Sequence, residues 1–105
     1  MDLNVEIEID MDDVEFIMGT KFKDFTIFIK NVYCNFCKSA YSAEIVDYKI
    51  FLTPNGDLTL DGKCGKCLKR VVRCIETGED QSNYDRAMHI RKIKIELLND
   101  YKKRP

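Results

Sequence analysis

Two short stretches, CNFC at residues 34–37 and CGKC at residues 64–67, decide the fold of this 105-residue chain. Each stretch places two cysteines three positions apart, and 26 residues separate the first pair from the second. Zinc prefers four soft ligands in tetrahedral directions, and a Cys-x2-Cys turn presents two thiolates to one ion. We therefore predict one structural Zn²⁺ ion per chain. Its ligands are Cys34, Cys37, Cys64 and Cys67.

Disulfide, redox and iron chemistry are the alternatives to zinc. The acidic N-terminus, MDLNVEIEIDMDD, is neither a signal nor a transit peptide, and no apolar run is long enough to span a membrane. We therefore expect a cytoplasmic protein, in which disulfides are rare. A thioredoxin-type site needs its cysteines at a strand-to-helix junction, and neither pair here precedes a helical pattern. Iron of the rubredoxin type uses the same four thiolates, so the sequence leaves zinc and iron open.

The two cysteine pairs and the strands around them resemble the zinc-ribbon class over residues 34–75. This class occurs in transcription factors, small RNA polymerase subunits and ribosomal proteins, and the resemblance implies that the four cysteines are the ligands. Members often carry glycine directly after the second cysteine of each metal-binding turn, or knuckle. This chain has Lys38 and Leu68 there, and Gly65 lies inside the second knuckle instead. The resemblance therefore points to the class and to no named family within it.

Strand patterns surround the knuckles. Residues 3–9 alternate between apolar and acidic side chains, as expected for a half-buried strand. The segment Thr53-Pro54-Asn55-Gly56 predicts a hairpin turn, because proline fixes a turn-compatible φ and Asn-Gly tolerates positive φ. Residues 11–18 predict a short helix or a turn. The predicted strands are residues 3–9, 24–33, 44–53, 57–62 and 68–77.

One long helix is predicted from about Asn83 to about Lys103, because apolar residues recur there with a helical period. Ser82 and Asp85 have the spacing of a capping box at its start. Arg91 and Lys94 interrupt the apolar face, where we expect their long side chains to extend past it to water. The broad apolar face comprises Tyr84, Ala87, Met88, Ile90, Ile93, Ile95, Leu97, Leu98 and Tyr101.

These elements together predict a single α+β domain over residues 1–105. An antiparallel zinc ribbon with its core at residues 34–75 is extended by N-terminal strands, and the helix at about residues 83–103 packs on it. The fifth cysteine, Cys74, shares a strand face with Val72, and we predict a small buried side chain. His89 falls on the polar stripe of the helix, where an exposed histidine is expected.

We expect a binding function without catalysis. A four-cysteine site leaves no open metal position, and the chain has no P-loop, no Rossmann glycine fingerprint and no HExxH motif. The favoured hypothesis is a protein-interaction or self-associating module that uses the apolar helix face. The partner of such a module is not identified by the sequence.

The alternative hypothesis is a ribbon that binds nucleic acid. Its aromatic residues for base stacking would be Tyr33, Phe36 and Tyr41. Its basic residues would be Lys63, Lys66, Lys69, Arg70 and Arg73. The overall charge favours the protein module, because four thiolates with Zn²⁺ carry −2 and take the formal net charge from −1 to −3.

Overall fold

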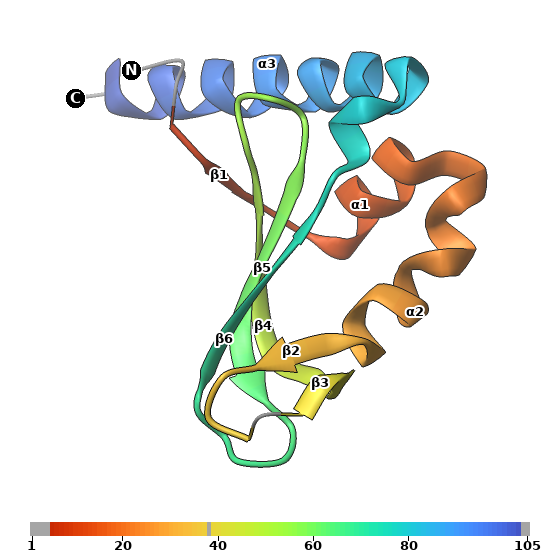
Figure 1. Ribbon diagram of the computed structural model, residues 1–105. Helices are drawn as coiled ribbons and strands as arrows, with labels where there is room; N and C mark the ends of the chain where they lie inside the picture. The colour runs from red at the N-terminus through yellow and green to blue at the C-terminus, as the bar shows by residue number, and fades with distance from the viewer. Residues whose placement is uncertain (1–4, 38, 104–105) are drawn as a thin grey trace.

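The computed structural model describes residues 5–37 and 39–103, with the side chains of residues 39–42 and 99–103 left out. It has an α+β fold, as predicted, with antiparallel sheets and a long C-terminal helix (Figure 1). The elements in chain order are β1 (Ile7–Ile9), α1 (Met11–Met18), the 3₁₀ helix η1 (Gly19–Asp24), α2 (Phe25–Lys30), β2 (Val32–Cys34), β3 (Ser39–Ala43), β4 (Ile45–Leu52), β5 (Leu58–Cys64), β6 (Arg70–Ile75), the 3₁₀ helix η2 (Thr77–Glu79) and α3 (Gln81–Lys103).

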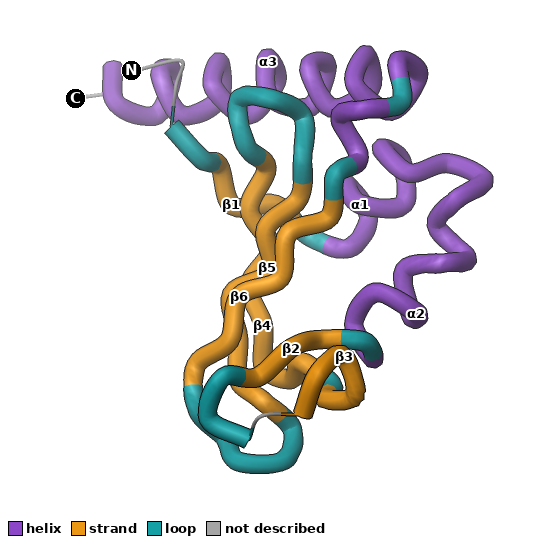
Figure 2. The backbone as a smooth tube through the Cα atoms, in the orientation of Figure 1, coloured by secondary structure: helices purple, strands orange, loops and turns teal. Residues whose placement is uncertain are grey.

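The described strands form two antiparallel sheets (Figure 2). One has the order β1-β4-β5-β6, and the other pairs β2 with β3. The predicted hairpin is confirmed as β4 and β5, with Leu52 opposite Leu58 across the turn. The amide of Gly56 donates to the carbonyl of Thr53 at 3.0 Å, and Gly56 has a φ of 82°. The Asn-Gly pair therefore supplies the positive φ that this turn needs.

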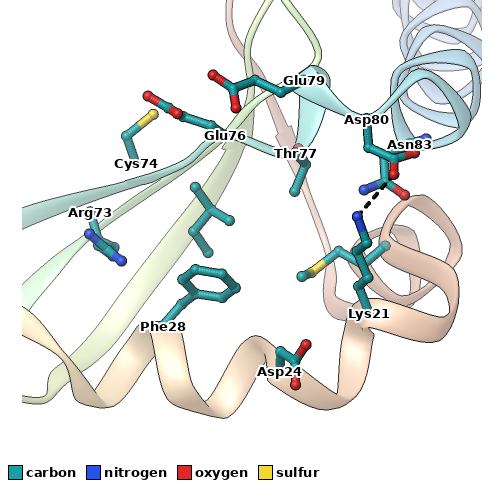
Figure 3. A pocket seen from close by; sticks show the side chains of 12 residues that line it. Lys21, Asp24, Phe28, Arg73, Cys74, Glu76, Thr77, Glu79, Asp80 and Asn83 are labelled. Carbon is teal, nitrogen blue, oxygen red and sulfur yellow. Dashed lines mark hydrogen bonds and ion pairs between the residues drawn. The ribbon is translucent and has the colours of Figure 1, made fainter.

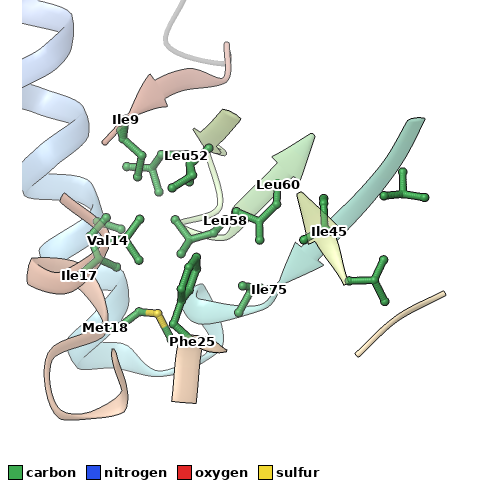
Figure 4. Close-up of a cluster of buried hydrophobic side chains, with 14 of the residues drawn as sticks. Ile9, Val14, Ile17, Met18, Phe25, Ile45, Leu52, Leu58, Leu60 and Ile75 are labelled. Atoms are coloured by element: carbon green, nitrogen blue, oxygen red, sulfur yellow. The ribbon is translucent and has the colours of Figure 1, made fainter. Parts of the chain in front are cut away.

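Helix α1 packs on one face of the larger sheet, where Val14, Ile17 and Met18 face Leu52 and Leu58 (Figure 4). Its start is fixed by a reciprocal capping box. The amide of Asp13 donates to the Asp10 carboxylate at 2.9 Å, and the Asp10 amide donates to the Asp13 carboxylate at 3.2 Å. Residues 11–18 are therefore a helix, which the sequence left open against a turn.

The predicted strand at residues 24–33 is wrong over most of its length. Residues 25–30 form helix α2, and only Val32 and Tyr33 of that range lie in a strand. Phe22, Phe25 and Ile29 have helical spacing and pack against the core, whereas Ile27 is exposed. β-Branched and aromatic residues favour a strand locally, but burial of this helical stripe determines the structure. The N-terminal extension is therefore one short strand, β1, followed by helices. Leu3 lies outside the described residues.

Helix α3 begins at Gln81, and Asp80 caps it in place of the predicted Ser82. The amide of Asn83 donates to the Asp80 carboxylate at 3.1 Å. Figure 1 shows that α3 crosses the turn end of the β4–β5 hairpin rather than lying along a sheet face. Only a narrow stripe of α3 is therefore buried. Among residues 81–98, whose side chains the structure describes, the buried ones are Asn83, Ala87, Arg91 and Ile95.

Arg91 does not extend to water as predicted. Its side chain is only 5% exposed, and Nη1 donates to the carbonyl oxygens of Val5 at 3.0 Å and Leu52 at 3.1 Å. Burial lowers the pKa of its guanidinium, because desolvation disfavours the charged form. Arg91 thus links α3 to Val5, just before β1, and to the end of β4. The apolar residues Ile93 and Leu97 lie outside the buried stripe of α3.

A bulge in β4 makes Gly62 structurally necessary. Val46 pairs with Lys63 and Lys49 pairs with Asp61, so two residues of β4 lie opposite Gly62. A Cβ atom on Gly62 would lie 2.6 Å from the carbonyl oxygen of Val46, which is closer than packed atoms can approach.

We expect Gly62→Ala to lower the free energy of unfolding by about 1–3 kcal/mol, because the bulge must move to accommodate the methyl group. Urea denaturation followed by circular dichroism measures this loss. Thr59→Ala, on the same strand and half-exposed, is the control and should change the free energy of unfolding much less. Equal stability of Gly62→Ala and wild type would contradict the close approach.

Candidate metal centre

The structure brings the four predicted cysteines together. Cys34 ends β2 and Cys64 ends β5, and Cys37 and Cys67 lie in the turns that follow. All four Sγ atoms lie within 4.8 Å of one another. The turns that follow β2 and β5 lie at the end of the molecule opposite α3 (Figure 1). Cys34 and Cys64 are fully buried, and their two partners are half-buried. Neither cysteine pair precedes a helix, so the arrangement differs from a thioredoxin-type site.

The distances within the cluster fit a tetrahedral metal ion. The sulfurs of Cys34 and Cys67 are 3.6 Å apart, and those of Cys37 and Cys64 are 3.7 Å apart. A tetrahedron with metal–sulfur distances of about 2.3 Å has sulfur–sulfur edges of about 3.8 Å. A disulfide would require about 2.05 Å, and all five cysteines are free. Each short contact joins one cysteine of each knuckle, so an ion bound here would cross-link β2–β3 to β5–β6.

Backbone hydrogen bonds shape the second knuckle. The amide of Lys66 donates to the Cys64 sulfur at 3.4 Å, and the amide of Leu68 donates to the Cys64 carbonyl at 2.8 Å. Leu68 takes a φ of 65° at the position where glycine is common in zinc ribbons. The amide of Gly65 donates to the carbonyl of Glu44 at 2.7 Å, which fastens the knuckle to the start of β4.

The pKa values of Cys64 and Cys37 are shifted in opposite directions. Amide donation from Cys67 and Lys66 lowers the pKa of Cys64 to about 6, because these hydrogen bonds stabilise its thiolate. The hydrogen bond with Cys67, together with desolvation, raises the pKa of Cys37 to about 12. Protons and a metal ion compete for the same sulfurs, so metal affinity falls as the pH falls.

The five predicted nucleic-acid residues do not form one surface. Lys63, Lys66 and Lys69 are exposed near the knuckle, but Arg70 donates two hydrogen bonds to Asp61, at 3.0 and 2.8 Å. These bonds lower the pKa of the Asp61 carboxyl and stabilise its anion. Arg73 lies on the other face of β6, with its guanidinium 5.6 Å from the centre of the Phe28 ring.

The aromatic side chains of the first knuckle are largely exposed. Phe36 is 61% exposed, and the Lys69 ammonium lies 5.2 Å from the centre of its ring. Tyr33 is also exposed. The predicted Tyr41 side chain lies outside the described residues.

Cys74 is exposed, so the prediction that it is buried is wrong. It shares a face with Val72 as expected, but that face of β6 is not covered, and Val72 is 49% exposed. The alternation along a strand identifies two faces, and only the tertiary structure determines which of them is buried. His89 is exposed on α3 as predicted, with its ring centre 6.1 Å from that of Phe16.

Comparisons with known proteins give no family for this chain. No protein-family model matches the sequence, and no similar protein was found among curated proteins or solved structures. In the described ranges, no helix has the length and apolar character needed to cross a membrane. The interpretation of the site therefore depends on its own geometry.

We expect Cys→Ser at Cys34, Cys37, Cys64 or Cys67 to release the metal and unfold at least residues 34–75. Loss of a structural zinc site removes a contribution of about 10 kcal/mol or more, as large as the stability of a typical domain. Elemental analysis and circular dichroism measure the two effects. Cys74→Ser is the matched control and should retain one metal ion per chain. Equal metal loss in that control, or a wild type without metal, would contradict the assignment.

Proposed function

We propose that this chain is a zinc-stabilised protein-interaction module of the zinc-ribbon type, without catalytic activity of its own. The observation that carries this proposal is the cluster of four cysteines. Their sulfurs all lie within 4.8 Å of one another, and two of the pairs, at 3.6 and 3.7 Å, are close to the edge length of a tetrahedral zinc site. Four thiolates occupy every position around a tetrahedral ion and leave none for water or substrate. Bound zinc would act as a cross-link between the two knuckles.

The arrangement of strands supports a zinc ribbon. The first knuckle lies between β2 and β3, and the second lies between β5 and β6. Strand β4 pairs with β5, which gives the second knuckle a sheet behind it. Two antiparallel hairpin-like units thus present two cysteines each to one point, as the resemblance to that class implies.

Exposed apolar side chains on α3 support a role in protein contacts. Leu97 is 60% exposed and Ile93 is 39% exposed, although both are large apolar residues. They lie about one helical turn apart, so they form neighbouring parts of the same helix surface. Adjacent exposed apolar side chains of this size commonly mark a contact with another protein.

We expect the zinc-loaded protein to self-associate through this part of α3. Light scattering over a concentration series measures its mass, and replacing both Ile93 and Leu97 by Glu should give a monomer. The matched control is Lys92→Glu, an exposed position on the same helix, which should leave the mass unchanged. A wild type that is monomeric throughout the series would contradict self-association.

Nucleic-acid binding is the second candidate function. Its support is the exposed Phe36 ring, which lies beside the ammonium of the exposed Lys69. Aromatic stacking combined with cations is a common way to bind single-stranded nucleic acid. Two observations count against it: Arg70 is bound to Asp61, and Arg73 lies on the opposite strand face.

A salt titration separates the two functions. Under the proposed function, we expect no measurable binding of labelled single- or double-stranded DNA or RNA at low salt, where attraction between charges is least screened. Binding that weakens steeply with salt would favour the nucleic-acid function. The slope should then decrease when Lys63, Lys66 and Lys69 are replaced by Ala together. Lys92→Ala on α3 is the control substitution.

A further inference from the structure

A groove of about 460 Å³ lies between β6 and the η1–α2 segment (Figure 3). Five consecutive residues, Arg73 to Thr77, line one wall. Alternate residues of a strand point to opposite faces, so consecutive residues line one groove when the edge of the strand borders it. Lys21, Asp24 and Phe28 contribute to the opposite wall. The groove therefore runs along a strand edge that has a helix beside it.

Strand β6 is an edge strand of the larger sheet. The amide of Cys64 donates to the carbonyl of Lys69 at 2.8 Å, which sets the alternation of the β5–β6 ladder. Because hydrogen-bonded pairs alternate along an antiparallel ladder, the backbone amide and carbonyl groups of Arg73 and Ile75 point to β5. Those of Val72 and Cys74 point away from it. Strand β2 lies near the knuckle end of β6, and the groove lies at the other end (Figure 1). The backbone groups of Cys74 are thus available at the groove.

Apolar side chains form part of the groove lining, beside one unusual donor. Met18, Phe28 and Ile75 line it together with the guanidinium of Arg73, which lies over the Phe28 ring. The Nε atom of Arg73 is buried and has no hydrogen-bond partner among the described residues. A buried donor without an acceptor carries a desolvation cost of about 1–3 kcal/mol.

The rim of the groove is acidic. Lys21 and Asp80 form an ion pair at 2.9 Å and offset each other. Within the described part of the chain, no ion pair engages the carboxylates of Asp24, Glu76 or Glu79, so with Arg73 the remaining formal charge is −2. A side-chain hydrogen bond with Glu76, together with the negative charge of that carboxylate, raises the pKa of Glu79. A ligand with positive charge complements this rim.

We infer that this groove binds an extended, basic segment of a protein partner, which adds to β6 as a further strand. The backbone of Cys74 would pair with the segment, as in other cases of strand addition. One set of alternate side chains would be apolar and face Phe28 and Ile75, and the other set would be Lys or Arg and face Glu76 and Glu79. This inference rests on the proposed protein-interaction function and names the chemistry of the partner.

The probes are short peptides that carry this chemistry. The principal probe is an acetylated, amidated, fluorescently labelled peptide in which valine and lysine alternate. A second peptide has glutamate in place of lysine, in the same alternation as the chain's own residues 5–9. A third is the valine–lysine peptide with N-methylated backbone amides, which cannot donate to a strand edge. Fluorescence anisotropy at low salt, with the zinc-loaded full chain, should show binding of the first peptide only.

Substitutions at Cys74 test the strand edge itself. Cys74→Pro removes the outward amide, and proline is tolerated on an edge strand where that amide makes no ladder bond. We expect it to weaken binding of the valine–lysine peptide at least about tenfold, which corresponds to 1.4 kcal/mol. Cys74→Ser keeps the amide and is the matched control, with affinity close to that of wild type. Replacing Glu76 and Glu79 by Lys should reverse the preference in favour of the valine–glutamate peptide.

Failure of the groove inference can be distinguished from failure of the proposed function by two further measurements. Metal content and mass are measured on the same samples. If the zinc-loaded, folded protein binds none of the three peptides, peptide binding in the groove is overturned, and the proposed zinc-stabilised module is unaffected. Equal binding of the N-methylated peptide, or equal affinity of Cys74→Pro and Cys74→Ser, overturns strand addition. If the variant with Lys at positions 76 and 79 still prefers the valine–lysine peptide, the assigned positive charge of the partner is overturned.

Discussion

The convergence of four sulfur atoms from two hairpin turns is the constraint on which the rest of the structure depends. Their positions, all within 4.8 Å, require β2–β3 and β5–β6 to approach each other at one end of the molecule. Cys34 and Cys64 are also buried in the apolar core, so the metal site and the core are continuous. A chain of 105 residues buries a modest core, and a metal cross-link is a common way to supplement one.

The opposite end of the molecule is stabilised by different interactions. There α1 packs against the β4–β5 hairpin, and α3 crosses the turn with Ala87 and Ile95 buried. Arg91 adds hydrogen bonds to the carbonyls of Val5 and Leu52. Apolar burial and backbone hydrogen bonds therefore stabilise one end, while the four-cysteine cluster lies at the other. The two ends are joined by β4, β5 and β6, which run the length of the sheet.

Features encoded locally could be predicted from the sequence. The spacing of the cysteines predicted the metal site, Asn55-Gly56 predicted the hairpin turn, and periodicity predicted α3. Features that depend on tertiary packing were predicted poorly. Residues 25–30 have the composition of a strand, but a helical stripe of aromatic residues packs against the core.

The predicted environments of two side chains, Cys74 and Arg91, were also wrong, because they too depend on tertiary packing. Cys74 lies on a strand whose alternation was predicted, but the covered face of β6 is the one that carries Arg73 and Ile75. Arg91 lies on an apolar helix face, but the carbonyls at the strand ends accept its hydrogen bonds. The groove beside β6 combines segments about 50 residues apart in the chain, and no local pattern indicates it.

The metal site and the groove are linked through β6. This strand begins three residues after Cys67, and the amide of Cys64 bonds to the carbonyl of Lys69 just before it. A cross-linked knuckle thus fixes the first residues of β6 and, through the ladder with β5, the direction of the edge as far as Cys74. An edge held in its extended conformation loses less conformational entropy when another strand pairs with it. If zinc binds the knuckles as proposed and a partner strand adds to β6 as inferred, the ion would favour recognition at the other end of the strand without touching the partner.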